Sequence, residues 1–259
     1  MDSLANGAKV YFAINTPWFS INITQTVITI LATTIILMIL ALLIKRSLKK
    51  RPGGFQVIVE KLVDMLYGLV ESTMGKHNLK FAPYIGTLFL SSIFCTLLGM
   101  TQIFRSATAD LSVTLAWALV TTGMVWFCNI KNFGFRSWLK GFTEPIVVMT
   151  PMNIVSEIAQ PISLAFRHFG NVAGGGVLTG LIYMALAGLT NILFGWISGL
   201  IGLIPFMQVG IPAFLSIYFD LFSGFVQALV FSLLTMVYVG AANPPPEELA
   251  DAKEAKEEN

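Results

Sequence analysis

The sequence predicts an all-α polytopic membrane protein with about five membrane-embedded helices, one amphipathic helix at the cytoplasmic interface and a long, tilted C-terminal helix hairpin. Of its 259 residues, 55% are hydrophobic and only 12% are charged, whereas an ordinary soluble domain has roughly 25% charged residues. Several apolar runs reach the ~20 residues that a helix needs to cross a ~30 Å hydrocarbon core. Basic residues cluster beside these runs, as they do in cytoplasmic loops.

The first crossing is predicted at residues 23–44, which are predominantly apolar. The basic residues that follow it are Lys45, Arg46, Lys49, Lys50 and Arg51. Because basic loops stay in the cytoplasm, this end is predicted to be cytoplasmic and the N-terminus to lie outside. Residues 55–75 carry an apolar stripe with charged residues on the opposite side, which predicts the amphipathic interfacial helix.

Two further crossings are predicted, one at residues 81–104 and one that ends near residue 130. The loop after them contains Lys131, Arg136 and Lys140, and is again predicted to be cytoplasmic. Two separate loops therefore agree on the same topology.

The C-terminal part is almost continuously apolar from residue 144 to residue 242, apart from a bend with Gly and Pro at residues 195–212. We expect two long helices in a hairpin, and both must tilt because each exceeds the length of a perpendicular crossing. Residues 1–242 are predicted to form a single membrane domain, and residues 243–259 a polar cytoplasmic tail.

Several classes of function lack support in the composition. The net charge is only +2 and the basic residues form no stripe, so no nucleic-acid partner is expected. Cys95 and Cys128 lie in apolar stretches without the spacing of metal ligands; we interpret both as buried hydrophobic residues and expect no metal or cofactor. The first residues lack the pattern of a signal or transit peptide, so we expect no N-terminal segment to be cleaved off.

Charged residues are scarce in the C-terminal apolar part. Between Ile158 and Pro246 only Arg167 and Asp220 are formally charged, and His168 is the one other group that titrates near neutrality. An arginine at the bilayer centre costs about 2.5 to 3.5 kcal/mol on insertion scales, so an incidental position is unfavourable and a functional one is favoured. Pairing of the arginine with a buried carboxylate, as structural glue, is the alternative.

Polar residues recur at helical spacing on both sides of the predicted hairpin. The first stripe contains Gln160, Ser163, Arg167 and Asn171, and the second contains Ser216, Asp220, Ser223 and Gln227. Two such stripes in an apolar hairpin indicate a hydrated path. Hydrogen bonds between neighbouring helices would explain the same pattern, and both interpretations stay open.

The glycines Gly174, Gly175 and Gly176, with Gly180 after them, do not form a phosphate-binding loop, because no Gly-Lys-Ser/Thr follows. Their spacing instead predicts close packing of another helix or of a moving partner against the backbone.

Residues 161–171, PISLAFRHFGN, resemble the signature of subunit a of F-type ATP synthases. Further likeness comes from PMNIVSE at 151–157, from ADLSVT at 109–114, and from Gln227 ahead of TMVY at 235–238. The resemblance extends from about residue 20 to residue 242.

The resemblance implies that the arginine matching Arg167 faces a rotating c-ring of small membrane subunits, each with a membrane-embedded carboxylate, and separates two aqueous half-channels. A guanidinium stays charged, so it favours loss of the proton from an approaching carboxylate. The resemblance also implies a non-catalytic subunit of a bacterial cytoplasmic membrane, with the c-ring, peripheral-stalk b subunits and the lipid bilayer as partners.

The chain departs from the family pattern at two positions that bear on proton transfer. Many relatives have glutamate where this chain has Gly176, and they often have histidine where it has Asp220. We expect Asp220 to supply the titratable group on the facing helix. Glu157 matches an acidic position before the arginine and is expected to line the cytoplasmic half-channel, with a solvated helix-end carboxylate as the alternative. For His168 we expect a packing or interfacial role.

These observations favour a proton-translocating stator subunit of a rotary F-type ATP synthase. In that interpretation Arg167, Asp220, Gln227, Asn171, Ser163 and Glu157 line the path. The alternative is a secondary transporter that binds a small anionic solute through Arg167, for which inverted repeats and broken helices would be expected and are not found in the sequence. A purely structural membrane subunit is a third possibility, against which the isolated charges argue.

Overall fold

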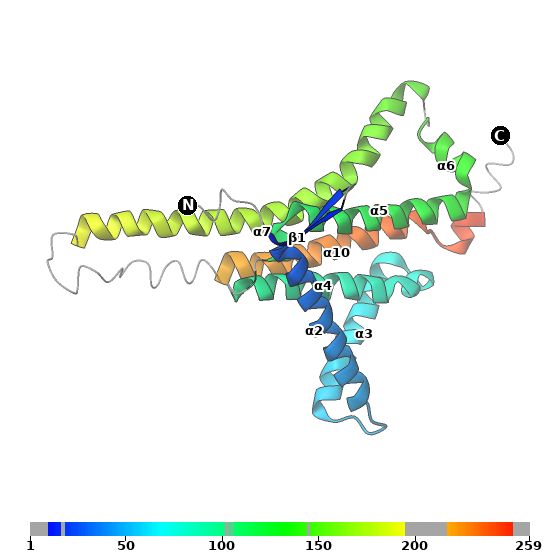
Figure 1. Cartoon of the computed structure of the whole chain (residues 1–259). Coiled ribbons are helices and arrows are strands. Elements are labelled where there is room, and N and C mark those ends of the chain that lie inside the picture. The colour runs from blue at the N-terminus through cyan, green and yellow to red at the C-terminus, as the bar shows by residue number, and fades with distance from the viewer. Residues whose placement is uncertain are drawn as a thin grey trace. The chain divides into compact units, whose positions relative to one another are not determined.

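The computed structural model describes residues 10–16, 19–101, 104, 106–143, 146–194 and 217–250 (Figure 1). The chain begins with the strands β1, Val10–Thr16, and β2, Phe19–Thr24. The helices are α2 Gln25–Ser47, α3 Gly54–Met74, α4 Ala82–Met100, α5 Leu111–Phe133, α6 Phe135–Gly141, α7 Thr150–Phe194 and α10 Ser223–Ala242, with the shorter turns η1 Lys76–Phe81, η2 Ala107–Ala109, η3 Val147–Met149 and η5 Ile217–Phe222.

The predicted fold class is confirmed. Five helical segments of the described chain are long and apolar enough to cross a membrane, namely Gln25–Ser47, Lys76–Met100, Leu111–Phe133, Val147–Thr190 and Ser223–Ala242. Helix α3 lies where the amphipathic helix was predicted, at Gly54–Met74; its place at the membrane surface stays a prediction. Helix α7 has 45 residues, as expected for the first long helix of the hairpin. The bend at 195–212 lies outside the described residues.

A short β-hairpin, which the sequence did not predict, precedes the first membrane helix. Strands β1 and β2 pair antiparallel from Val10 opposite Thr24 to Thr16 opposite Phe19. Both strands are rich in aromatic and β-branched residues, which favour extended backbone. The apolar residues of this segment continue directly into the first membrane helix. The preference for extended backbone was therefore not recognised in the sequence.

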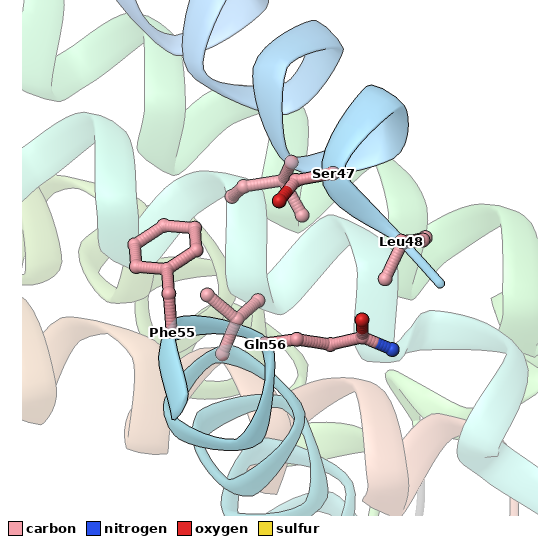
Figure 2. Close-up of a pocket in the computed structure, with 6 residues that line it drawn as sticks. Ser47, Leu48, Phe55 and Gln56 are labelled. Carbon is pink, nitrogen blue, oxygen red and sulfur yellow. The ribbon is translucent and has the colours of Figure 1, made fainter. Parts of the chain in front are cut away.

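The loop between α2 and α3 is held by one buried glutamine. Gln56 accepts a hydrogen bond from the Lys49 backbone nitrogen (2.9 Å) and donates one to the Lys49 carbonyl (3.1 Å). Its amide nitrogen also donates to Glu60 (2.7 Å). Figure 2 shows Gln56 in a small depression between the end of α2 and the start of α3, together with Ser47, Leu48 and Phe55. The glutamine thus fixes the backbone of the basic loop. The residues that line this depression do not suggest a catalytic or binding site.

The residues cluster into two compact units, and each is described by itself. Unit 1 contains residues 1–34, 92–111 and 167–228, and unit 2 contains residues 35–91, 112–166 and 229–259. Each unit contains part of α2, α4, α7 and α10, so no single cut in the chain separates the two.

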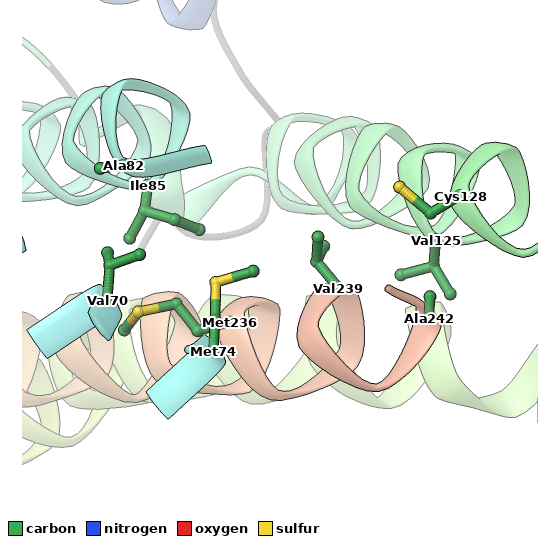
Figure 3. Packing of buried hydrophobic residues seen from close by; sticks show 9 residues of the cluster. All are labelled: Val70, Met74, Ala82, Ile85, Val125, Cys128, Met236, Val239 and Ala242. Atoms are coloured by element: carbon green, nitrogen blue, oxygen red, sulfur yellow. The ribbon is translucent and has the colours of Figure 1, made fainter. Parts of the chain in front are cut away.

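Unit 2 contains a hydrophobic core to which four helices contribute (Figure 3). Its buried members are Val70, Met74, Ala82, Ile85, Val125, Cys128, Met236, Val239 and Ala242. Trp117 and Phe231 pack edge to face nearby, with ring centroids 6.4 Å apart. Cys128 is a free thiol within this core, and Cys95 of unit 1 is also buried and free, so the prediction of two buried cysteines is confirmed.

A cluster of asparagines joins three helix ends in unit 2. Asn78 in η1 is fully buried and donates to the backbone carbonyl of Asn243, just after α10 (2.9 Å). The Asn243 side chain donates in return to Asn78 and accepts from Asn132 of α5 (2.7 Å). The ring nitrogen Nε2 of His77 lies 2.8 Å from the same Asn243 carbonyl oxygen. Neutral amides therefore satisfy the backbone at these buried helix ends without burying a charge.

We expect Asn78→Ala to destabilise the protein, because it leaves the buried side-chain nitrogen of Asn243 without its acceptor. Such a loss costs about 1 to 3 kcal/mol, and each kcal/mol lowers the melting temperature by about 2 to 4 °C in a domain of this size. Thermal unfolding of the purified protein in mild detergent measures the change. The control is Thr87→Ala, an exposed position in α4 whose hydroxyl donates only to the carbonyl one turn before it. Equal melting temperatures for the two variants would show that the asparagine cluster contributes nothing.

Candidate functional site

Helix α7 presents two different faces around Arg167. Phe166 is 52% exposed and Arg167 is also exposed, whereas His168 is fully buried. Successive residues of an α-helix point about 100° apart, so neighbours in the sequence can face opposite environments. Gly175 and Thr179 continue the buried side at seven and eleven positions after His168. The guanidinium is therefore carried on the open side of the helix.

His168 joins α7 to α4. Its ring nitrogen Nε2 lies 3.1 Å from the hydroxyl oxygen of Ser92, and both residues are 0% exposed. The serine hydroxyl can donate or accept, so the pair can bond with either tautomer of the ring. A buried polar pair in an apolar surrounding is costly to separate, because each group would lose its partner.

Asn171 joins α7 to α10. Its side-chain nitrogen donates a hydrogen bond of 2.6 Å to the side-chain oxygen of Gln227. Gln227 is only 3% exposed, and its own amide nitrogen has no hydrogen-bond partner among the residues that the structure describes. Two site residues predicted from separate polar stripes are thus brought into direct contact, one helical turn from Arg167.

Helices α4 and α10 approach each other at a glycine. A Cβ atom added at Gly224 would lie 2.5 Å from the methyl carbon of Thr96, closer than real contacts allow. The Thr96 hydroxyl donates to the Ser92 carbonyl (3.0 Å), which holds the side chain in this orientation. Together with the two hydrogen bonds above, this contact joins α4, α7 and α10 pairwise within unit 1.

The glycines of α7 do not share one environment. Gly174 and Gly176 are exposed and Gly180 is partly exposed, and a Cβ added at any of the three would meet no described atom within 4 Å. Gly175, which was predicted to face a partner with the others, is buried instead. It follows His168 by seven residues, close to two turns, and so points to the interior side.

Glu157 and Ser163, the remaining α7 residues of the predicted path, differ in surroundings. Glu157 is partly buried and accepts a hydrogen bond from the indole nitrogen of Trp126 in α5. Glu157 therefore has a hydrogen-bond donor in α5. Ser163 is exposed, and it precedes Arg167 by four residues in the same helix.

The facing helix is described only in part. Asp220 belongs to η5, Ile217–Phe222, a π-helical turn that leads into α10. Ser216 and the position of the Asp220 side chain lie outside the described residues, so the role of this carboxylate stays a prediction. Among the described residues no group of three or more His, Cys, Asp and Glu could hold a metal ion.

Comparison with known proteins shows the family of the chain. A profile of the family described as "ATP synthase A chain" matches residues 26–240. The chain belongs to this family. The expected resemblance to subunit a of ATP synthases is therefore confirmed over nearly the whole membrane-embedded part.

Individual relatives agree with this assignment. The chain is 31% identical to "ATP synthase subunit a, sodium ion specific" of Propionigenium modestum, over 86% of this chain and 76% of that protein. It is 30% identical to "ATP synthase subunit a" of Staphylococcus carnosus, over 83% and 88% of the two chains. It is 32% identical to "ATP synthase subunit a" of Bacillus velezensis, over 84% and 91%.

Family membership gives the general role of this subunit a. It is a multi-pass stator subunit in the membrane sector of an F-type ATP synthase and works in a complex with other subunits. It is not catalytic itself, because the catalytic activity of the synthase is in its F1 part.

Sequence reasoning missed three residues that organise the site, namely Ser92, Thr96 and Gly224. Each looked like an ordinary small residue of an apolar helix. The spacing of Ser92 and Thr96, one turn apart on α4, was a weak signal for a polar edge that faces another helix.

We expect Gly224→Ala to lower the thermal stability of the complex, because the new methyl group collides with Thr96. Overpacking of this kind costs about 1 to 3 kcal/mol. The double variant Gly224→Ala/Thr96→Ser removes the colliding methyl carbon and should recover most of the loss. Gly68→Ala in α3 is the matched control, since its Cβ would meet nothing within 4 Å. Thermal stability of the purified complex is the measurement, and failure of Thr96→Ser to rescue would contradict the close contact.

Proposed function

We propose that this subunit carries protons to and from a c-ring of small membrane subunits through two aqueous half-channels, and that Arg167 is the fixed charge between them. The observation that carries this proposal is the exposure of Arg167 on α7 beside the fully buried His168. A guanidinium on the open side of a membrane helix is available to a partner.

The surroundings of Arg167 among the described residues fit the same role. Within these residues the one ion pair joins Lys76 and Glu71, far along the chain from Arg167. No described carboxylate therefore neutralises the guanidinium; the side chain of Asp220 lies outside the described residues. A carboxylate on a passing ring subunit would supply the missing partner, since charges in membranes are generally paired.

The surface beside Arg167 suits close approach of another helix. Gly170 and Gly174 are exposed, lie three and seven residues after Arg167, and have open space where a Cβ would stand. Small residues let helix backbones pack closely in lipid. Small hairpin subunits of a ring can thus bring their carboxylates within reach of the guanidinium.

The proposed transfer has a simple proton balance. A ring carboxylic acid that reaches Arg167 releases its proton into one half-channel, because the guanidinium favours the carboxylate form. The carboxylate then passes Arg167 and takes up a proton from the other half-channel. Arginine is suited to this task because it does not lose its own proton when desolvated.

The amide pair Asn171–Gln227 adds polar groups one turn from the arginine. The amide nitrogen of Gln227 has no described partner, although the residue is almost completely buried. A buried amide is normally satisfied by a protein group or by water. We therefore assign this amide to the lining of the proposed path.

The basic loops give the proposed orientation. The basic residues at the ends of α2 and α5 support a cytoplasmic position for both ends, with the N-terminus outside and the C-terminus inside. We further propose contact with peripheral-stalk b subunits and a location in the bacterial cytoplasmic membrane. Residues 1–242 then act as one membrane domain, and the tail at 243–259 is cytoplasmic; its last residues, 251–259, lie outside the described part.

Replacement of Arg167 by Ala or Lys should abolish ATP synthesis and ATP-driven proton pumping in assembled complexes. The Lys variant should fail as well, because an ammonium lacks the planar fork and can neutralise when buried. Pumping is measured by dye quenching in inverted membrane vesicles, with ATP hydrolysis and subunit content as checks. Arg136→Ala, at an exposed position in the loop helix α6, is the control. Normal pumping by an assembled Arg167→Ala complex would refute the proposal.

The same vesicles test the identity of the ion. A proton gradient without Na⁺ should drive ATP synthesis by the unmodified complex. Synthesis that requires a Na⁺ gradient would overturn the proton assignment and would match the sodium specificity in the name of the Propionigenium modestum relative.

Asp220→Asn should reduce proton flux by about 10-fold or more, the range expected for loss of a proton-transfer group. Adding Gly176→Glu to this variant should restore part of the flux, because it returns an acid to the same proposed path. ATP-driven pumping and passive proton flux through the membrane sector are the measurements. Wild-type flux in Asp220→Asn membranes would remove Asp220 from the path.

A further inference from the structure

We propose that His168 is a positioning residue for Arg167: its hydrogen bond to Ser92 fixes the rotation of α7 about its own axis and thereby the direction in which the guanidinium points. This inference rests on the proposed function for its readout. It assigns a role to a buried histidine that the proposed proton path does not use.

His168 and Arg167 are neighbours in α7, but they lie on different sides of the helix. His168 lies on the buried side of α7 with Gly175 and Thr179, and Arg167 points about 100° away from it. Because a helix is stiff, fixing the direction of one of these side chains fixes the direction in which the Cα–Cβ bond of the other leaves the helix. An anchor at residue 168 is therefore an anchor for residue 167.

The contact between His168 and Ser92 is a hydrogen bond, which depends on direction. A leucine in place of His168 would be held only by van der Waals contacts, which allow small rotations. The His168 ring nitrogen and the Ser92 hydroxyl are 3.1 Å apart and both residues are fully buried. Rotation of α7 would break this bond where water cannot replace it, so the restoring force is directional.

Two hydrogen bonds join α7 to two other helices. Asn171 binds Gln227 on α10, while His168 binds Ser92 on α4, so α7 is held by two different helices within one turn. The contact of Gly224 with Thr96 fixes α10 against α4 in the same unit. One contact alone would leave α7 free to pivot, whereas two contacts to a fixed pair define its rotation.

The functional consequence follows from the length of the arginine side chain. A small rotation of the backbone moves the distant guanidinium further than it moves the Cα atom. Displacement of a reacting group by ~1 Å can cost about 10²-fold in rate. Loss of the His168 anchor should therefore impair proton transfer more than it impairs folding.

The test measures the rate of ATP-driven proton pumping in vesicles that contain the whole assembled complex, normalised to subunit content. His168→Leu keeps an apolar filling but removes the hydrogen bond, and should lower this rate by about 10-fold or more. His168→Gln can still bond to Ser92 and should stay within about twofold of the unmodified complex. If His168 only filled space, leucine would serve as well as glutamine.

Ser92→Ala removes only the hydroxyl oxygen that bonds to His168, and should impair pumping as much as His168→Leu does. If the leucine variant does not accumulate, Ser92→Ala tests the same hydrogen bond. The double variant should be no worse than the poorer single variant, because both remove the same bond. Thr190→Ala is the control: it removes another buried hydroxyl of α7, which donates only to the carbonyl one turn before it, and should couple normally.

Three outcomes would overturn the inference: normal coupling in both His168→Leu and Ser92→Ala, equal impairment in Leu and Gln variants, or additive losses in the double variant. Arg167→Ala is measured alongside to separate the two proposals. Normal pumping in Arg167→Ala sinks the proposed function itself. Loss in Arg167→Ala together with normal coupling in His168→Leu and Ser92→Ala sinks only the positioning role.

Discussion

A permanent positive charge within an apolar helix is the constraint on which the rest of this site depends. A guanidinium keeps its charge when it leaves water, and an arginine at the bilayer centre costs about 2.5 to 3.5 kcal/mol on insertion scales. The described part of the chain offers no carboxylate partner to the guanidinium, and α7 turns it to the open side. In the described part of the chain the charge is therefore left on an exposed face of α7.

Keeping that charge in one direction requires close contact between helices. The polar pairs His168–Ser92 and Asn171–Gln227 act over hydrogen-bond distances, so the backbones that carry them must lie near one another. Gly224 permits this by presenting no Cβ to Thr96. In lipid, where hydrophobic association between helices is weak, small residues and a few hydrogen bonds are the available means of fixing such geometry.

The other compact unit uses uncharged groups for a comparable purpose. Asn78, Asn132 and Asn243 bind one another and nearby backbone carbonyls at three helix ends. Amides can both donate and accept, so three of them close a network that would otherwise need charged residues or water. Both units therefore depend on specific polar contacts set in an apolar background, and those contacts decide which faces of the helices remain open.

The sequence by itself determined the membrane class, the amphipathic helix at Gly54–Met74 and the singular position of Arg167, because composition and periodicity are local properties. Only the tertiary structure decided the partners, since Ser92 and His168 are separated by 76 positions and no periodicity links them. It also separated buried Gly175 from its exposed neighbours, because burial depends on which side of a helix another helix covers.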